Sequence, residues 1–271
     1  MKKKLFAIGM ILTLTAGMFM LTGCGDKEVA EEAPAKDKFV VGLDDTFAPM
    51  GFRNEKNELV GVDIDLANEL GNELGMDVEF KVIDWDAKEL ELKAGTIDCV
   101  WNGMSITPDR LEKMALSDKY LNNKIVLMSL TKGDVNVTDG KQLADLKIGT
   151  QVGSSALKML QADPNYESFK DNISEYKTYD VAIMDLKAGR VDVVAVDQIL
   201  GEYTNKNLNG EMKENDYSLG DDFYVIGFAK DNTELRDKVN EAMKKMFEDG
   251  RSEEISNKWF DKNIVVNEPL E

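Results

Sequence analysis

Histidine is absent from the 271 residues, and cysteine occurs only twice, as Cys24 and Cys99. Without histidine the chain can build neither a Ser-His-Asp triad nor a Cys-His catalytic pair, and the usual zinc sites are excluded too. A lone catalytic Asp or Glu remains possible. Cys99 is the only cysteine after Cys24, so the folded body has no second cysteine for a disulfide. Because Cys99 lies in an apolar run, we expect a small buried side chain.

Basic residues are also scarce: 33 Lys and Arg stand against 51 Asp and Glu, which gives a net charge of −18. Nucleic-acid binding needs basic patches, so this balance disfavours it. The charge favours a soluble surface, but it identifies no ligand. We expect no cofactor.

The N-terminus has the pattern of a secretory leader. Lys2-Lys3-Lys4 precede an apolar run over 5–21, and Leu21-Thr22-Gly23-Cys24 looks like a lipobox, in which the cysteine is lipidated, for example with palmitate. A transmembrane anchor is the alternative, which the short run disfavours. We therefore expect a signal peptide over 1–23 and an acidic, lipid-anchored tether over 24–38. This places the protein outside the cytoplasm, held on a Gram-positive-type cell membrane.

After residue 38, apolar strand patterns alternate with helical ones. The pattern predicts strands over 39–43, 78–83 and 97–101, and helices over 61–74 and 87–94, with Asp63 capping the first helix and Gly75 ending it. Such alternation is typical of a parallel sheet covered by helices, an α/β fold. Ligands of these sheets bind at the carboxyl ends of the strands. The residues that follow strands here are Asp44, Phe47, Trp85, Asn102 and Ser105.

The stretch 101–110 carries the clearest site signal. Asn102 and Gly103 are expected to turn the backbone after the strand. Thr107 and Pro108 then predict a helix start, with Thr107 as the N-cap. The helix carries Arg110, whose guanidinium can hold a carboxylate through two hydrogen bonds. The alternative is that Arg110 makes an ordinary surface ion pair.

Two later segments extend this pattern. The helix expected to begin at Ser154-Ser155 would present backbone N–H groups to an anion. Residues 92–100 also resemble residues 186–194 at a spacing of 94, and each segment reads as a helix end, a glycine turn and a buried strand. Two lobes of similar construction would explain the repeat, and chance similarity is the alternative.

Taken in order, several segments resemble the amino-acid-binding proteins of ABC import systems, of the type that binds polar or basic amino acids. They are 41–44 with 47–49, 61–66, 105–107 with Arg110, 151–155, 192–197 and 257–260. The resemblance implies a type II periplasmic-binding-protein-like fold with two α/β lobes, two hinge strands near 120–124 and 221–225, and a ligand cleft between the lobes. It divides the body into a first lobe over 39–120 and 225–271 and a second lobe over 121–224.

The resemblance also implies site roles. Arg110 would grip the α-carboxylate with backbone N–H groups of Ser105 and Ser155. Asp197 would take the α-ammonium group, together with the backbone carbonyl of Asn102 and the Ser105 hydroxyl. Phe47 and Trp85 would sandwich the ligand side chain, and Asp44 would meet its polar tip. Gln151 departs from the lysine of some relatives. The expected binding residues are Asp44, Phe47, Trp85, Asn102, Gly103, Met104, Ser105, Arg110, Gln151, Ser154, Ser155 and Asp197.

The acidic and aromatic residues favour arginine or lysine as ligand, with glutamine next and cystine possible. Asp45 and Asp86 either add to this cation site or face solvent. The expected partners are the amino acid and an ABC permease with its ATPase, and the binding protein is expected to be a monomer. An enzyme on the same scaffold and a ligand sensor for a receptor are the alternatives. No Glu at the strand ends offers a general acid for the enzyme.

Overall fold

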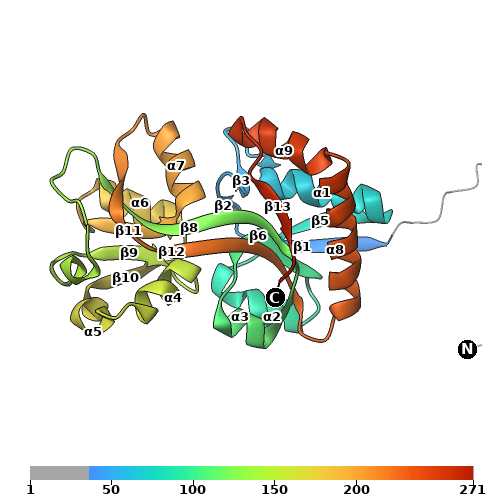
Figure 1. Ribbon diagram of the computed structural model, residues 1–271, viewed down its shortest axis with the longest axis horizontal. Coiled ribbons are helices and arrows are strands. Elements are labelled where there is room, and N and C mark those ends of the chain that lie inside the picture. Colours follow the sequence, from blue (N-terminus) through green and yellow to red (C-terminus); the bar gives the residue numbers. More distant parts are fainter. Residues whose placement is uncertain (1–36, 271) are drawn as a thin grey trace, which may run out of the picture. The chain divides into compact units, whose positions relative to one another are not determined.

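The computed structural model describes residues 37–270. The expected leader, Cys24 and all but the end of the tether lie outside these residues. Within them, ten strands form one mixed sheet, whose main path runs β10-β9-β11-β8-β12-β6-β1-β5 (Figure 1). In the described part of the chain no helix is long and apolar enough to span a membrane.

The first lobe contains the β6-β1-β5 end of the sheet, where β1 pairs in parallel with both β5 and β6. Its strands are β1 (Lys38–Leu43), β5 (Asp77–Val82), β6 (Cys99–Ser105), β7 (Met114–Leu116) and β13 (Val265–Glu268). Its helices are α1 (Val62–Leu74), α2 (Lys88–Lys93), α3 (Pro108–Lys113), α8 (Thr233–Glu248) and α9 (Arg251–Phe260), with a 3-10 turn at Trp85–Ala87. A small separate sheet holds β2 (Thr46–Phe47), β3 (Gly51–Arg53) and β4 (Leu59–Val60).

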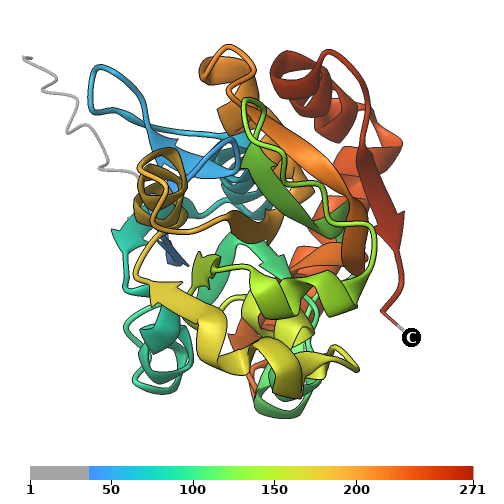
Figure 2. The same ribbon diagram turned by 90° about the vertical axis from the view of Figure 1, so that its left-hand side faces the viewer.

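The second lobe contains the other end of the sheet, with β9 (Ile148–Gln151), β10 (Ile173–Tyr176) and β11 (Val193–Asp197) in parallel. Its helices are α4 (Ser155–Ala162), α5 (Tyr166–Phe169), α6 (Tyr179–Lys187) and α7 (Gln198–Asn207), with 3-10 turns at Gly140–Asp145 and Lys170–Asn172. In Figure 1, α6 and α7 lie above these strands and α4 and α5 below; Figure 2 shows the lobe from its own side.

Two long antiparallel strands join the lobes, β8 (Lys119–Leu130) and β12 (Met212–Ala229). β8 pairs with β11 of the second lobe, and β12 pairs with β6 of the first. The hinge segments expected near 120–124 and 221–225 lie on these strands, and Asn123 pairs with Asp222 in the register. The bounds of 39–120, 121–224 and 225–271 for the lobes stay a prediction.

The internal repeat has a structural counterpart. Asp98 accepts a hydrogen bond from the backbone N–H of Val40 at 2.7 Å, and Asp192 accepts one from Lys147 at 2.8 Å. Each aspartate also donates its own backbone N–H to the same partner residue's carbonyl, at 2.8 Å in both cases. Gly95 and Gly189 adopt left-handed φ values of 66° and 69°. The two segments therefore perform the same task, which is to lock a helix end to the neighbouring strand.

The first helix begins differently from the prediction. Its N-cap is Gly61, and no side chain caps it. Asp63 is fully buried instead, and it accepts hydrogen bonds from the Gly103 N–H at 2.7 Å and the Tyr120 hydroxyl at 3.0 Å. The predicted cap was wrong because a buried acceptor beside β6 gains more from these donors than from the helix end. Gly75 ends α1 in the left-handed conformation, as predicted.

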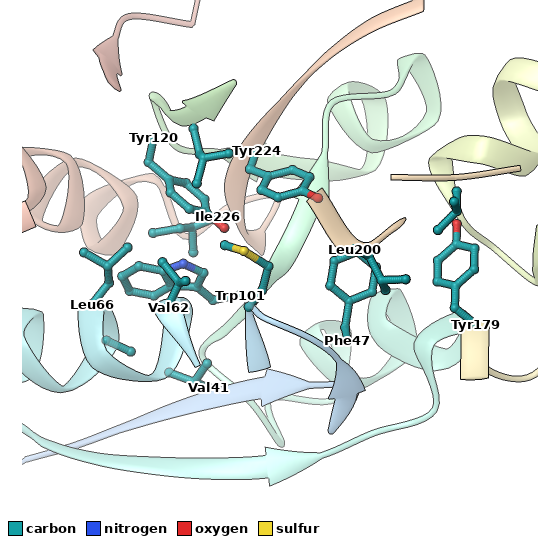
Figure 3. Packing of buried hydrophobic residues seen from close by; sticks show 14 of the residues in the cluster. Val41, Phe47, Val62, Leu66, Trp101, Tyr120, Tyr179, Leu200, Tyr224 and Ile226 are labelled. Atoms are coloured by element: carbon teal, nitrogen blue, oxygen red, sulfur yellow. The ribbon is translucent and has the colours of Figure 1, made fainter. Parts of the chain in front are cut away.

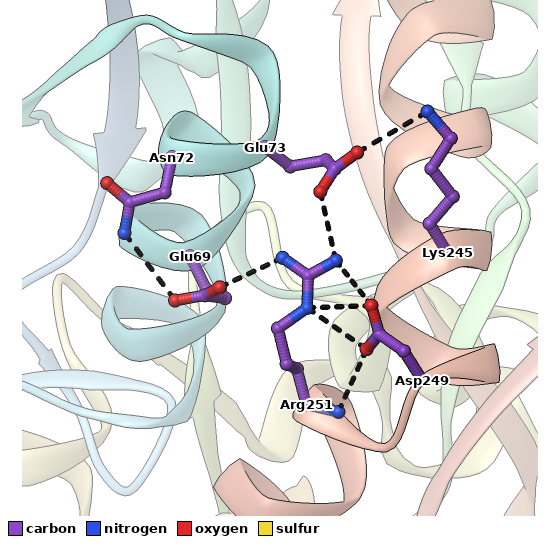
Figure 4. Close-up of polar contacts among 6 residues, drawn as sticks. All are labelled: Glu69, Asn72, Glu73, Lys245, Asp249 and Arg251. Carbon is purple, nitrogen blue, oxygen red and sulfur yellow. Dashed lines mark hydrogen bonds and ion pairs between the residues drawn. The ribbon is translucent and has the colours of Figure 1, made fainter.

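Two kinds of contact hold the first lobe together. Trp101, Tyr120 and Tyr224 pack edge to face or tilted in the apolar core (Figure 3). Cys99 is buried in the same cluster of residues. Near the surface, Arg251 of α9 bonds Glu69 and Glu73 of α1 at 2.9 Å each (Figure 4). The guanidinium therefore ties α9 to α1.

Candidate functional site

Charged and polar side chains from both lobes converge on one small cavity. Its lining consists of Phe47, Trp85, Gly103, Ser105, Arg110, Gln151, Ser154, Ser155, Tyr179 and Asp197. The cavity measures about 10 Å³, room for about one water molecule. The lobes are therefore closed on each other, and an amino acid could enter only if they parted.

Arg110 reaches the cavity from the start of α3. Thr107 is the N-cap, and its hydroxyl accepts the Arg110 N–H at 3.2 Å, as the sequence predicted. The side chain is only 3% exposed, so the alternative of a surface ion pair is wrong. Its guanidinium donates to the Ser105 carbonyl at 2.7 Å and to the Gly153 carbonyl of the other lobe at 3.2 Å. Burial lowers the pKa of Arg110, and the carboxylates of Asp222 and Asp197 oppose that shift.

β6 runs further than predicted, to Ser105 rather than Trp101. Gly103 still breaks its regularity, with φ of 55°. A Cβ atom there would lie 2.7 Å from Phe47 Cε1, so only glycine fits. The irregularity lets both Gly103 and Ser105 face the cavity, whereas Met104 between them packs into the core against Gly227.

The second lobe offers the first turn of α4 to the same cavity. The Ser154 side chain caps this helix by accepting the Leu157 N–H at 3.1 Å. The Ser105 hydroxyl of the first lobe donates to the Ser155 hydroxyl at 2.9 Å. The first N–H groups of a helix lack partners inside it, so this end can receive an anion next to Arg110.

Asp197 ends β11 and is 2% exposed. Asn123 Nδ2 donates to its Oδ1 atom at 2.8 Å, and the Tyr224 hydroxyl donates to the same atom at 3.0 Å. Burial is the main cause that raises the pKa of this carboxyl, and the nearby Asp222 carboxylate adds to it. A buried carboxylate without a cation is costly, which makes Asp197 a strong acceptor for an ammonium group.

Asp44 and Asn102 lie behind the lining. Asp44 Oδ1 accepts from the backbone N–H and the hydroxyl of Thr46 at 3.0 and 2.7 Å. Its Oδ2 accepts from Gln151 Nε2 of the second lobe at 2.7 Å. Asn102 Oδ1 accepts the Asp44 N–H at 3.2 Å. The Gln151 amide thus stands where a cationic ligand tip could meet Asp44.

Asp45 and Asp86 do not contribute to the lining. Asp45 bonds Arg53 at 2.6 Å, and Asp86 is exposed. Asp86 therefore faces solvent, whereas Asp45 is half-buried and paired with Arg53, so whether either acid helps to bind a cation stays a prediction. Among the described residues, no group of three or more acidic or cysteine side chains is placed to hold a metal ion.

The sequence analysis missed one residue of the lining and one buried residue beside it. Tyr179, the first residue of α6, lines the cavity and packs against Phe47 of the first lobe with ring centroids 5.9 Å apart (Figure 3). The signal was available, because Tyr179 follows the carboxyl end of β10. The aromatic partner of Phe47 in the structure is Tyr179; Trp85 instead carries the Lys88 ammonium 4.9 Å from its ring centre.

Lys88 is the second missed residue. It is 3% exposed, and its ammonium donates to the Trp85 carbonyl at 2.9 Å and the Gly153 carbonyl at 3.3 Å. Burial, and after it the Arg110 charge, lowers the pKa of Lys88 to about 7. A basic ligand therefore meets less repulsion than a fully charged lysine would give. An amphipathic helix pattern alone gives no sign that such a lysine is buried.

A larger hollow of about 560 Å³ lies between α7 and α9, with Tyr203 and Trp259 in its wall. It contains no arginine and no buried carboxylate. We assign the site to the smaller cavity because the groups that could pair with both ends of a zwitterion converge there.

Comparisons with known proteins show the family of the chain. The family model of the bacterial extracellular solute-binding proteins, family 3, matches residues 39–262. The arginine-binding extracellular protein ArtP of Bacillus subtilis is 29% identical over 255 residues, which cover 93% of this chain and 96% of ArtP.

Solved structures give the same result. A substrate-binding protein of an ABC uptake transporter from Streptococcus pneumoniae, with bound histidine, is 34% identical with a TM-score of 0.79, covering 84% of this chain and 94% of that one. The arginine-, lysine-, histidine-binding protein ArtJ of Geobacillus stearothermophilus is 30% identical with a TM-score of 0.74, covering 86% and 97%. The fold is thus the two-lobed solute-binding fold, and the enzyme interpretation falls away. The chain belongs to family 3 of the bacterial extracellular solute-binding proteins, which bind a solute for transport and are not enzymes.

Proposed function

We propose that this protein captures a basic L-amino acid, arginine or lysine before histidine and glutamine, by lobe closure, and delivers it to an ABC permease. Cystine stays a weaker candidate. The observation that carries the proposal is the cavity with Arg110 and the α4 N-terminus on one side and Asp197 on the other. The names of the relatives support the ligand class, since those reported above bind arginine, lysine or histidine.

The allocation of the two charged ligand groups follows from burial. A zwitterion taken out of water needs a partner for each charge. Arg110 with Ser105 and Ser155 would take the carboxylate, and Asp197 would take the ammonium group. Each charge-assisted hydrogen bond is worth roughly 1.5–3 kcal/mol. Both are made at once only with the lobes shut, so the ligand stabilises the closed state.

The ligand side chain would lie among Phe47, Trp85 and Tyr179 and point at Asp44, displacing the Gln151 amide. We predict that Asp44→Asn weakens arginine binding by about tenfold or more and glutamine binding much less, because only arginine brings a positive charge. Asp45→Asn is the matched control, since its carboxylate is bonded to Arg53. Equal losses for both ligands in titration calorimetry would remove Asp44 from the recognition of the side chain.

A thermal-shift screen of residues 25–271 against the twenty amino acids, ornithine and cystine tests the function. A ligand that binds only the native state raises the melting temperature by mass action. We expect the largest shifts with arginine or lysine. A shift with none of these compounds would overturn the assignment to amino acids.

We further propose that Cys24 is lipidated and anchors the protein to the outer face of the cell membrane through the 24–38 tether. The lipobox pattern at 21–24 carries this proposal. Mass spectrometry of the mature N-terminus should find an acylated Cys24. An unmodified N-terminus that begins elsewhere would refute the anchor.

A further inference from the structure

A second buried carboxylate, Asp222, stands beside Asp197. Asp222 lies on β12 and is 3% exposed. Asn123 on β8 holds both acids, because its Nδ2 atom donates to Asp197 Oδ1 at 2.8 Å and to Asp222 Oδ2 at 2.9 Å. The Asn123 amide thus bonds two carboxylates. It lies where β8 and β12, which pair there, pass from one lobe to the other.

No cation pairs with either acid. In residues 37–270, no Lys or Arg nitrogen lies within 4.0 Å of an oxygen of either carboxylate. Arg110 is the charged group that faces them, but its guanidinium is bonded to the carbonyls of Ser105 and Gly153. The other groups that face the pair are the hydroxyls of Tyr224, Ser105 and Tyr179.

Two buried carboxylates that accept from the same amide nitrogen oppose each other's ionisation, because a nearby like charge raises the pKa of a carboxyl. Burial is the largest cause that raises the pKa of Asp222, while Ser105 and Asn123 oppose it. The pKa of Asp197 is raised as well, by burial and by Asp222. With no ligand bound, burial and mutual repulsion therefore favour a proton on the pair.

We propose that Asp222 is a second carboxylate of the α-ammonium subsite, and that the incoming ammonium ion displaces the proton which Asp197 and Asp222 share. This deepens the proposed function and rests on it. The charges balance: a pair with one proton and one negative charge receives an ammonium ion, becomes doubly negative, and releases one proton to the solvent. Asp222 thereby links ligand binding to β12, a strand that joins the lobes.

Titration calorimetry with L-arginine tests this, run near pH 7 in phosphate and in Tris, whose protonation heats differ. The difference in heat counts the protons released. L-histidine and L-glutamine are titrated as well, because the α-ammonium group is common to all three. For the wild type we expect release of up to about one proton per ligand bound, with affinity falling as pH falls from about 8 to 6.

Asp222→Asn should abolish most of this release, flatten the pH dependence, and weaken binding by about tenfold at pH 8, where the wild-type pair is more readily ionised. The matched control is Asp221→Asn on the same strand, whose carboxylate is exposed and lies 4.0 Å from Lys124. It should behave as the wild type does.

Binding without proton release by the wild type overturns the inference but leaves the proposed function standing, and this result needs no variant that might misfold. If the wild type and a folded Asp222→Asn protein release the same number of protons, the inference is likewise overturned and the proposed function stands. Failure of all three amino acids to bind overturns the proposed function and the inference with it.

Discussion

Arg110 and Asp197 illustrate at the scale of single residues why this cavity suits a zwitterion. Both side chains are almost completely buried, yet neither forms an ion pair in the described part of the chain. Backbone carbonyls satisfy the guanidinium, and an amide and a hydroxyl satisfy the carboxylate. Neutral partners leave each charge only partly compensated. An ion of the opposite sign would therefore bind strongly to either group.

The first residue-scale prediction concerns Arg110→Ala. We expect it to weaken binding of every amino acid at least tenfold, because the α-carboxylate is common to all and loses a charge-assisted contact worth roughly 1.5–3 kcal/mol. Lys113→Ala at the exposed end of the same helix should leave the affinity unchanged. An unaltered affinity in Arg110→Ala, measured by calorimetry, would take the guanidinium out of the site.

The second residue-scale prediction concerns Asp63. Burial raises the pKa of its carboxyl to about 7. Between the unfolded pKa near 4 and this value, the native state binds the proton more tightly, so the stability that Asp63 contributes is complete at low pH and is lost as pH rises through 7. The change amounts to roughly 4 kcal/mol at most. Asp63→Asn keeps an acceptor for the Gly103 N–H and the Tyr120 hydroxyl but cannot ionise.

Urea unfolding of both proteins between about pH 4 and pH 8 measures this effect. The stability of Asp63→Asn relative to the wild type should improve steadily with pH. Other buried acids, including Asp197 and Asp222, are present in both proteins and cancel in the comparison. A difference that does not change with pH would mean that Asp63 titrates as an ordinary carboxyl.

At the scale of elements, β6 shows which features local sequence patterns predict and which they do not. The apolar run over 97–101 predicted the strand, and Thr107-Pro108 predicted the helix start correctly. Asn102-Gly103 was interpreted as the end of the strand, since Gly commonly ends one. The strand continues to Ser105 because β12 pairs with it on the far side, with Tyr224 opposite Ser105. A pairing with residues more than a hundred positions away leaves no local signal.

Glycine substitutions provide the prediction for this element. Gly75 and Gly103 both have left-handed φ values, but a Cβ atom at Gly75 meets nothing within 4 Å, whereas one at Gly103 meets Phe47 at 2.7 Å. Gly75→Ala should cost about 1 kcal/mol of unfolding free energy from backbone strain alone. Gly103→Ala should cost at least twice as much and also weaken amino-acid binding, because Phe47 must move. Equal costs in urea unfolding would show that the contact with Phe47 is unimportant.

At the scale of the whole described body, polar contacts between the lobes hold the cleft shut. Besides the contacts within the cavity, Lys177 pairs with Asp84 at 2.6 Å and Lys158 with Asp109 at 2.8 Å, all with exposed side chains. Exposed ion pairs contribute little each, so they can break and reform as the lobes move. A ligand that adds two charge-assisted contacts inside the cleft therefore decides between the open and the closed state.

Much of this arrangement could be predicted from the sequence. The rule that ligands bind at the carboxyl ends of parallel strands predicted that Phe47, Trp85 and Ser105 lie close together, and all three line the cavity. The repeat at 92–100 and 186–194 matches equivalent turns in both lobes. Burial could not be predicted for charged residues such as Lys88, Asp63 and Asp222, because a charged residue usually indicates solvent exposure. Their positions depend on contacts between distant segments, which no local pattern encodes.

The central claim is that the cleft recognises both charged ends of an α-amino acid at once. Titration calorimetry with L-arginine, agmatine and 5-guanidinopentanoate tests it most directly, since agmatine lacks the carboxylate and 5-guanidinopentanoate lacks the amino group. We predict tight binding of arginine and a loss of at least about a hundredfold for each analogue, as each leaves one buried charge without its partner. Binding of either analogue as tight as that of arginine would contradict the claim.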